Sequence, residues 1–138
     1  MAVLIDTSVF IALERRGMPF APTDMRTVSP GERVAIAAIT ASELLAGVRL
    51  STPVERRVRR EAYVENILGG VAVMPFDLAV ARVHAGLAVD LTRRGSRIGA
   101  NDLLIAATGL TYHHAVLTAN AREFRHVPGL EVRTLTLS

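Results

Sequence analysis

The stretch MAVLIDTSVFIAL (residues 1–13) changes its character at one acidic residue. Apolar residues lead into Asp6, and a second apolar run follows two hydroxyl residues. A short apolar run that ends at a polar cluster is typical of a buried strand, and an acid or hydroxyl before an apolar segment favours a helix start. We therefore predict a strand over residues 2–6 and a helix from Thr7 to about Arg16.

Strand-like and helix-like segments alternate along the rest of the chain. The further expected strands are 33–39, 71–76, 115–120 and 130–137, and the further expected helices are 40–50, 53–70, 77–95 and 101–113. Residues 17–31 contain three of the six prolines, which predicts a mostly irregular connection. Strands that alternate with helices pair in parallel and are covered by helices on both faces. This order predicts one α/β domain over residues 1–138 with a central parallel sheet of four to five strands.

The composition limits the class of protein to which the chain can belong. Half of its 138 residues are hydrophobic and only 4% are aromatic, an aliphatic bias that suits buried parallel strands. No apolar stretch approaches the ~20 residues of a membrane span, and the first apolar run lacks the basic region of a signal peptide. The chain has no cysteine, which excludes disulfides and fits a reducing compartment. We therefore expect a cytoplasmic protein with no membrane partner.

Four acidic residues occupy equivalent places along the chain. Asp6 ends the first predicted strand, and Glu43 lies in the first turn after the second. Asp102 lies near the start of its predicted helix, and Glu123 follows the fourth predicted strand. Right-handed crossovers place the carboxyl ends of parallel strands along one edge, where the functional crevice of such sheets lies. We therefore expect these carboxylates to meet at that edge.

Each of these acids also has a structural interpretation as a helix cap. Asp6 could cap the helix that follows it, and Asp102 could be favoured near the start of its helix by the helix dipole. Thr40 to Glu43, and likewise Asn120 to Glu123, could each form a capping box. Capping does not explain why the acids flank strongly apolar segments, where an unpaired carboxylate is costly. Asp77, in contrast, is interpreted only as the cap of its helix.

A divalent cation would relieve the repulsion between carboxylates gathered at one edge. Ligands that are all oxygen favour a hard ion, Mg²⁺ or Mn²⁺. Zinc is disfavoured because the chain has no cysteine and its four histidines are not spaced as zinc ligands usually are.

Four motifs, in this order and at these separations, carry a resemblance to a known family. They are LIDTSVFIAL (4–13), TASELLAG (40–47), GANDLLIAAT (99–108) and VLTANAREF (116–124). Together they resemble the PIN-domain ribonucleases, and among them the VapC-type toxins of prokaryotic toxin–antitoxin pairs. The resemblance implies a three-layer α/β/α sandwich, metal-dependent endonuclease activity on RNA, a homodimer and a cognate antitoxin protein as partner.

The resemblance also implies roles for individual residues. Asp6, Glu43 and Asp102 match the three main acidic positions of the family, and Glu123 stands where the family usually has aspartate. We expect Asp6 and Asp102 to be the principal ligands of one or two Mg²⁺ or Mn²⁺ ions, and Glu43 to bind directly or through water. Glu123 completes the site in this hypothesis. The expected supporting residues are Thr7, Ser8, Asn101, Thr118 and Asn120.

Every one of the 16 basic residues is an arginine, whose planar fork suits phosphate. Two groups are candidates for contacts with the RNA backbone, although most such groups are simply solvated faces. The first group shares one face of a predicted helix and consists of Arg56, Arg59 and Arg60. The second group lies just before the third motif and consists of Arg93, Arg94 and Arg97. Contacts of this kind give affinity that depends on salt and little on sequence.

Aromatic residues contribute little to the predicted RNA site. Phe10, Phe76 and Phe124 are expected in the core. Phe10, Leu13 and the helix ELLAGVRL (43–50) are also candidates for a groove that an amphipathic antitoxin helix would cover.

Two alternative functions stay open, and a third is disfavoured. The chain could be an RNA-processing or DNA flap nuclease outside a toxin–antitoxin pair, or a non-catalytic nucleic-acid-binding domain with the same fold. A haloacid-dehalogenase-like phosphatase also begins with a strand that ends in aspartate, but it needs a second acid where this chain has Ser8.

Overall fold

The computed structural model describes residues 2–21 and 28–136. Its centre is a five-stranded sheet in the order β3-β2-β1-β4-β5, and all four neighbouring pairs of strands are parallel. The strands are β1 (Ala2–Ile5), β2 (Arg33–Ala37), β3 (Ala72–Met74), β4 (Ala115–Thr118) and β5 (Val132–Thr134). The predicted α/β fold with a central parallel sheet is confirmed.

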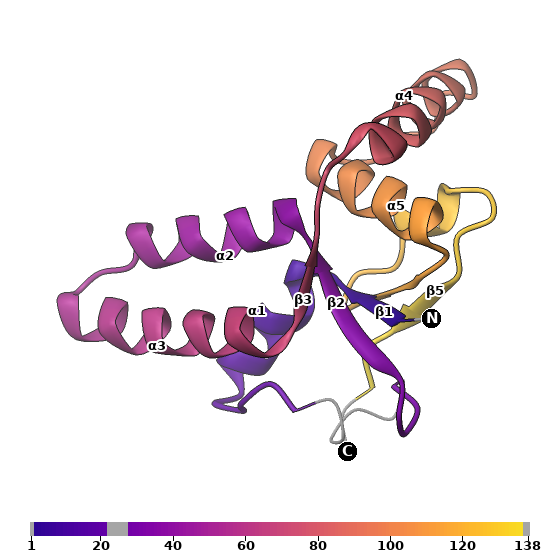
Figure 1. Cartoon of the computed structure of the whole chain (residues 1–138). Coiled ribbons are helices and arrows are strands. Elements are labelled where there is room, and N and C mark those ends of the chain that lie inside the picture. The colour runs from indigo at the N-terminus through magenta and orange to yellow at the C-terminus, as the bar shows by residue number, and fades with distance from the viewer. Residues whose placement is uncertain (1, 22–27, 137–138) are drawn as a thin grey trace.

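Helices cover both faces of this sheet (Figure 1). They are α1 (Thr7–Arg15), α2 (Ala38–Leu50), α3 (Val54–Gly70), α4 (Leu78–Arg93), α5 (Ala100–Tyr112) and the short 3-10 helix η2 (Phe124–His126). Side chains alternate between the faces of a strand. Val3 and Ile5 of β1 accordingly pack with residues of α1, α2 and α3, whereas Leu4 packs with residues of α4 and α5. The result is the expected three-layer sandwich.

The order of the strands reverses next to β1. From β1 the chain builds outward to β2 and β3 on one side, and then returns to add β4 and β5 on the other. Functional crevices of open parallel sheets lie at the carboxyl ends of the strands where such a reversal occurs. The carboxyl ends of β1 and β4, at Ile5 and Thr118, meet at this point.

The start of α2 differs from the prediction. The second strand ends at Ala37, and α2 begins at Ala38 instead of Thr40, because the alanine-rich run after Ile36 has a strong helix propensity. Thr40 therefore lies inside the helix, fully buried, and α2 has no side-chain cap. The interpretation of Thr40 to Glu43 as a capping box is wrong.

Two predictions concern the connection from β3 to α4, of which one is confirmed and one is wrong. Asp77 caps α4 as predicted, because its Oδ1 accepts a hydrogen bond of 3.0 Å from the backbone N–H of Val80. Phe76 is not a core residue, since 49% of it is exposed. The strand β3 lies at the edge of the sheet and ends at Met74, so Phe76 falls outside the covered part of the sheet. Phe10 and Phe124 are buried as predicted.

The irregular connection predicted over residues 17–31 is only partly described. Residues 17–21 and 28–31 form no helix or strand, and residues 22–27 lie outside the described residues. Among the helices of the described chain, none is both long and apolar enough for a membrane crossing.

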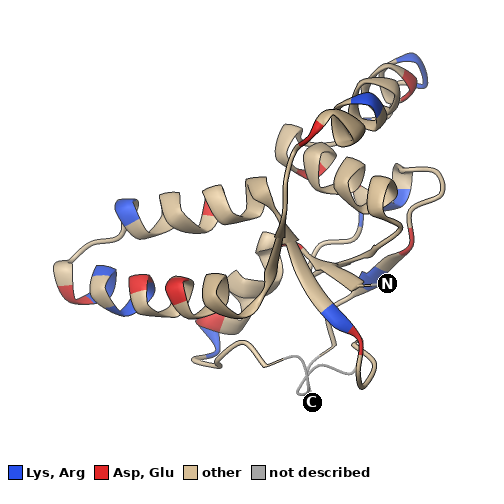
Figure 2. Cartoon of the chain, in the orientation of Figure 1, with Lys and Arg blue, Asp and Glu red and all other residues tan. Residues whose placement is uncertain are grey.

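Charge is distributed unevenly over the helices. Figure 2 shows basic and acidic residues along α3, whereas most of α2 carries neither. The helices α2 and α3 lie side by side and extend together beyond the sheet (Figure 1).

Candidate functional site

Asp6 lies at the carboxyl end of β1, the central strand, and is only 5% exposed. Its Oδ2 accepts a hydrogen bond of 2.6 Å from the Ser8 hydroxyl and one of 2.8 Å from the Thr118 hydroxyl. Asp6 precedes α1 but its side chain makes no capping hydrogen bond, so the interpretation as a helix cap is wrong. Hydroxyls from α1 and β4 instead hold this buried carboxylate.

The hydroxyls around Asp6 form a small network of their own. The oxygens of Ser8 and Thr118 lie 3.1 Å apart. The backbone N–H of Ala119 donates to the Ser8 hydroxyl at 3.0 Å, and that of Asn120 donates to the Thr118 hydroxyl at 3.0 Å. The loop after β4 is thus connected to Asp6, and Asn120 takes part through its backbone.

Glu43 joins α2 to the elements on either side of it. Its Oε1 accepts a hydrogen bond of 2.6 Å from the Thr7 hydroxyl at the start of α1. Its Oε2 accepts one of 3.1 Å from the amide of Asn101 in the first turn of α5. Both oxygens of Glu43 therefore have fixed donors, and the predicted supporting residues Thr7 and Asn101 lie beside it.

Asp102 lies in the first turn of α5. The pKa of its carboxyl reflects the charges of the other three acids. Burial, followed by the negative charges of Asp6, Glu123 and Glu43, raises the pKa of its carboxyl to about 6. Like charges raise a carboxyl pKa only when they lie close to it. The structure thus brings the four predicted acids, which are far apart in sequence, to one edge of the sheet.

Glu123 lies after β4 and contacts the start of α5. Its Oε1 accepts a hydrogen bond of 2.8 Å from the backbone N–H of Gly99, the residue directly before α5. It does not cap η2, which has no side-chain cap, so the second capping box is also wrong. The contribution of Gly99 was not predicted, because a backbone donor leaves no signal in the residue types.

The donor set of this region fits a hard divalent cation, because all its side-chain ligands are carboxylate, hydroxyl or amide groups. In residues 2–21 and 28–136, however, no group of three acidic or histidine side chains is oriented to hold one metal ion. Glu43 and Glu123 instead direct their oxygens to protein donors. Binding of a cation would therefore require some of these side chains to turn.

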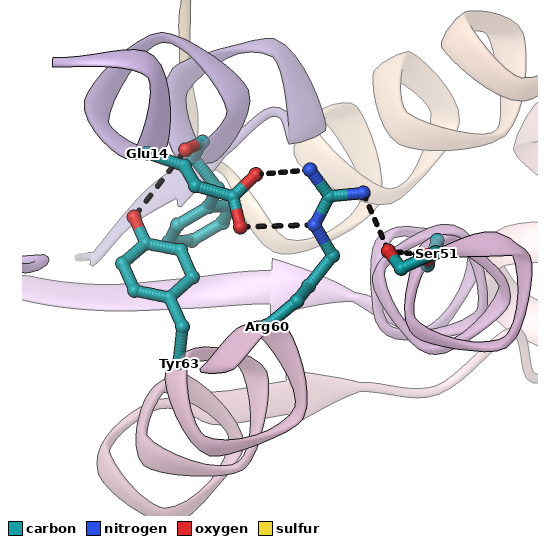
Figure 3. A network of polar contacts seen from close by, with 6 residues as sticks. Glu14, Ser51, Arg60 and Tyr63 are labelled. Carbon is teal, nitrogen blue, oxygen red and sulfur yellow. Dashed lines mark hydrogen bonds and ion pairs between the residues drawn. The ribbon is translucent and has the colours of Figure 1, made fainter. Parts of the chain in front are cut away.

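The predicted RNA-contacting arginines fall into two kinds. Arg60 is engaged within the protein, because its guanidinium forms a two-point ion pair with Glu14 (Nη2–Oε1 2.8 Å) and donates to the Ser51 hydroxyl (Figure 3). Arg94 donates to the backbone carbonyl of His126 at 3.0 Å. The other four are exposed: Arg56, Arg59, Arg93 and Arg97. Arg94 is exposed as well, so five of the six predicted arginines present their charge largely to solvent.

Comparisons with known proteins agree with this architecture. The model of the PIN domain family matches residues 3–130. A ribonuclease VapC of Rickettsia bellii is 33% identical over 99% of this chain and 98% of its own. The structure of DNA-bound VapBC from Salmonella typhimurium superposes with a TM-score of 0.83 at 26% identity, covering 97% of this chain and 98% of that one.

A third similar protein comes from Mycobacterium tuberculosis. The structure of VapBC-5, a member of the VapBC family of toxin–antitoxin systems, superposes with a TM-score of 0.75 at 28% identity and covers 99% of this chain and 98% of that one. The family model, the full-length relative and the parallel sheet with acids at the ends of its central strands all agree. The chain therefore belongs to the PIN domain family, as a protein of the VapC type.

Proposed function

We propose that this protein is a metal-dependent endoribonuclease and the toxin of a toxin–antitoxin pair. The observation that carries the proposal is the convergence of Asp6, Glu43 and Glu123 on Asp102, whose carboxyl pKa they raise together with burial. Such a concentration of negative charge in a half-buried site favours a divalent cation. The full-length relative named ribonuclease VapC supports RNA as the substrate.

Asp6 and Asp102 would hold the cation, Mg²⁺ or Mn²⁺, and Glu43 would bind it directly or through water. When bound, such an ion supplies Lewis-acid activation of water and stabilisation of charge on phosphate. The residues of the chain orient these ligands. Ser8 and Thr118 donate to Asp6, and Thr7 and Asn101 donate to Glu43.

Glu43 is the candidate base for the attacking water. Its two oxygens are held by neutral donors, an hydroxyl and an amide, so it is oriented without being neutralised by a basic side chain. Hydrolysis of the phosphodiester by water would leave a 5′-phosphate and a 3′-hydroxyl. In this proposal Arg93 and Arg97, which are exposed and precede Asp102 in the chain, would contact the RNA backbone.

The proposed partners are a cognate antitoxin and a second copy of the chain. Solved VapBC complexes among the similar structures support the antitoxin. An acidic site invites a basic segment of such a partner, and the neighbouring apolar surface on α1 and α2 suits an amphipathic helix.

The test compares the wild type with Asp102→Asn, and uses Asp90→Asn, at an exposed position of α4, as a matched control. Induced expression of the wild type and of Asp90→Asn should arrest growth and produce new fragments in total RNA, whereas Asp102→Asn should do neither. The purified wild type should cleave RNA with Mn²⁺ or Mg²⁺ and stop in excess chelator.

Other outcomes would point to the alternative functions. Cleavage of DNA but not of RNA would indicate a DNA nuclease, and cleavage without growth arrest would indicate RNA processing outside a toxin–antitoxin pair. Binding of RNA without cleavage at ample Mn²⁺ would indicate a non-catalytic domain. Full activity in chelator would contradict the metal-dependent reaction.

A further inference from the structure

The side chain of Thr40 carries a buried hydroxyl that makes no hydrogen bond. Thr40 lies in the first turn of α2 and is 0% exposed. Within the part of the chain that the structure describes, its Oγ1 is the one fully buried side-chain oxygen or nitrogen without a hydrogen-bond partner. Such a group lowers stability, because the hydroxyl loses its hydrogen bonds to water and gains none in return. It is therefore a candidate for a role in another state of the protein.

Other buried threonines of the fold donate their hydroxyls to a partner. Thr7 and Thr118 donate to carboxylates of the acidic site. Thr108, on α5, donates to the backbone carbonyl of Leu104 at 2.8 Å. A threonine inside a helix often uses this kind of partner, the carbonyl one turn before it. Thr40 makes no such bond, so its hydroxyl is available to a group that changes its orientation.

Thr40 lies one helical turn before Glu43. Residues three apart on an α-helix share a face, with about 5–6 Å between their Cβ atoms, so a hydroxyl and a carboxylate at these positions can reach each other. The strand β2 pairs in parallel with β1 and leads directly into α2. The first turn of α2 therefore begins at the same edge of the sheet as Asp6, and Thr40 belongs to the surroundings of the acidic site.

The hydrogen bonds of Glu43 show why a further donor would be needed. Its Oε1 accepts from Thr7 at 2.6 Å, and its Oε2 accepts from Asn101 at 3.1 Å. If the carboxylate turns toward a cation, it gives up at least one of these donors. A carboxylate has about four acceptor positions on its two oxygens, so it can bind an ion and still accept from a hydroxyl. Thr40 supplies an unused hydroxyl at the right distance along the helix.

We propose that Thr40 is a positioning residue, whose hydroxyl donates to the Glu43 carboxylate when Glu43 turns to bind the divalent cation. The inference rests on the proposed function and adds what holds Glu43 in the cation-bound state. It implies that the hydroxyl lowers the stability of the metal-free protein and raises that of the cation-bound protein. A buried water beside Thr40 would instead pair the hydroxyl in both states.

The test removes the hydroxyl while it keeps the shape of the side chain, in Thr40→Val. Thr40→Ser retains the donor. Thr108→Val is the matched control, because it removes a paired hydroxyl from another buried helical position. Thermal melting is measured in chelator and over a series of Mn²⁺ concentrations, and the dissociation constant of Mn²⁺ follows from the dependence of the melting temperature on concentration.

The expected results differ between the two conditions. In chelator, Thr40→Val should melt about 3–5 °C above the wild type, because the unpaired hydroxyl is gone, whereas Thr108→Val should not melt above it. With Mn²⁺, Thr40→Val should bind the ion about tenfold more weakly, as expected for the loss of one hydrogen bond to a charged group. Thr40→Ser and Thr108→Val should bind it within about twofold of the wild type. The Mn²⁺ concentration for half-maximal RNA cleavage should follow the same order.

Two results would overturn the proposal. If Thr40→Val does not fold, or does not melt above the wild type in chelator, the hydroxyl already has a partner in the metal-free protein, such as a buried water. If Thr40→Val binds Mn²⁺ as tightly as the wild type does, the hydroxyl is not used in the cation-bound state, and the proposed ribonuclease function is unaffected. A wild type that shows no shift with Mn²⁺ is distinct from both, because it contradicts the metal-dependent function and this inference together.

Discussion

At the scale of single residues, Glu123 connects the loop after β4 to α5. Its carboxylate accepts from the backbone N–H of Gly99, which lies three residues before Asp102. A glutamine at this position keeps an oxygen that can accept the same hydrogen bond, whereas an alanine does not. The role of Glu123 therefore depends on whether the site needs its charge or only its position as an acceptor.

We predict that Glu123→Gln retains most of the RNA cleavage rate and that Glu123→Ala loses it. Loss of a hydrogen bond to a charged acceptor corresponds to about 2 kcal/mol, so Glu123→Ala should also melt at a lower temperature in chelator. The measurements are single-turnover cleavage and thermal melting. If Glu123→Gln is as inactive as Glu123→Ala while it melts like the wild type, the charge itself is required, as for a metal ligand.

Thr118 permits a second test at this scale. Thr118 is fully buried and donates one of the two side-chain hydrogen bonds to Asp6. We predict that Thr118→Val, which keeps the shape but removes the donor, lowers the free energy of unfolding by about 1–3 kcal/mol. Thr118→Ser retains the hydroxyl, so its free energy of unfolding should fall by less. Denaturant unfolding measures the free energy of unfolding of both variants. A loss in Thr118→Ser equal to or greater than that in Thr118→Val would show that packing of the methyl group matters at least as much as the hydrogen bond.

The raised pKa of Asp102 makes the stability of the metal-free protein depend on pH. Its carboxyl has a pKa of about 6 in the folded chain against an ordinary value of 3.8, so the folded state binds the proton more tightly. Stability linked to Asp102 is therefore fully present below about pH 4 and is lost as the pH rises toward 6. In chelator, Asp102→Asn should melt above the wild type at pH 8, and this advantage should disappear at pH 4. A constant advantage at both pH values would contradict the shifted pKa.

The sequence predicted which acids meet but not how they are held. Asp6, Glu43 and Asp102 could be placed because parallel strands direct their carboxyl ends to one edge. The bond from Gly99 to Glu123 could not, because a backbone donor depends on the path of a loop. The occupation of both oxygens of Glu43 by Thr7 and Asn101 depends on side-chain rotamers, which residue types do not determine.

At the scale of secondary-structure elements, α1 and α3 are joined by the ion pair of Glu14 and Arg60. Both side chains are about one-third exposed, at 28% and 34%, so solvent weakens the pair. A double-mutant cycle with Glu14→Gln and Arg60→Gln should give a coupling of about 0.5–1 kcal/mol in denaturant unfolding. A coupling near zero would mean that the ion pair adds nothing to the apolar packing and the Tyr63–Phe10 hydrogen bond between the two helices.

The ends of helices and strands were harder to predict from the sequence than their presence. The helix α2 begins two residues before Thr40 because alanine favours a helix, whereas the apolar run 33–39 was interpreted as one continuous strand. Phe76 was placed in the core because an aromatic residue beside an apolar run is usually buried. Its exposure follows from the edge position of β3, which depends on the strand order and not on the local sequence.

At the scale of the whole molecule, the strand order places the acidic site at the most constrained part of the fold. The strand β1 has a neighbour on each side and helices on both faces, and Asp6 follows it directly. The alternation of segments predicted the parallel sheet, but the order β3-β2-β1-β4-β5 depends on crossovers that the segments do not specify. Because the acids come from β1, α2, α5 and the loop after β4, their mutual repulsion acts against the folded state as a whole.

A cation that relieves this repulsion should therefore stabilise the entire chain. At a concentration ten times its dissociation constant, a ligand of the folded state adds about 1.4 kcal/mol, which corresponds to roughly 5 °C in the melting temperature of a domain of this size. We predict that millimolar Mn²⁺ produces such a shift in the wild type and in the control Asp90→Asn. Asp6→Asn and Asp102→Asn should show little or none, because each removes a proposed ligand and part of the repulsion. An equal shift in all four proteins would place the bound ion elsewhere, and no shift in the wild type would contradict a metal site at this edge of the sheet.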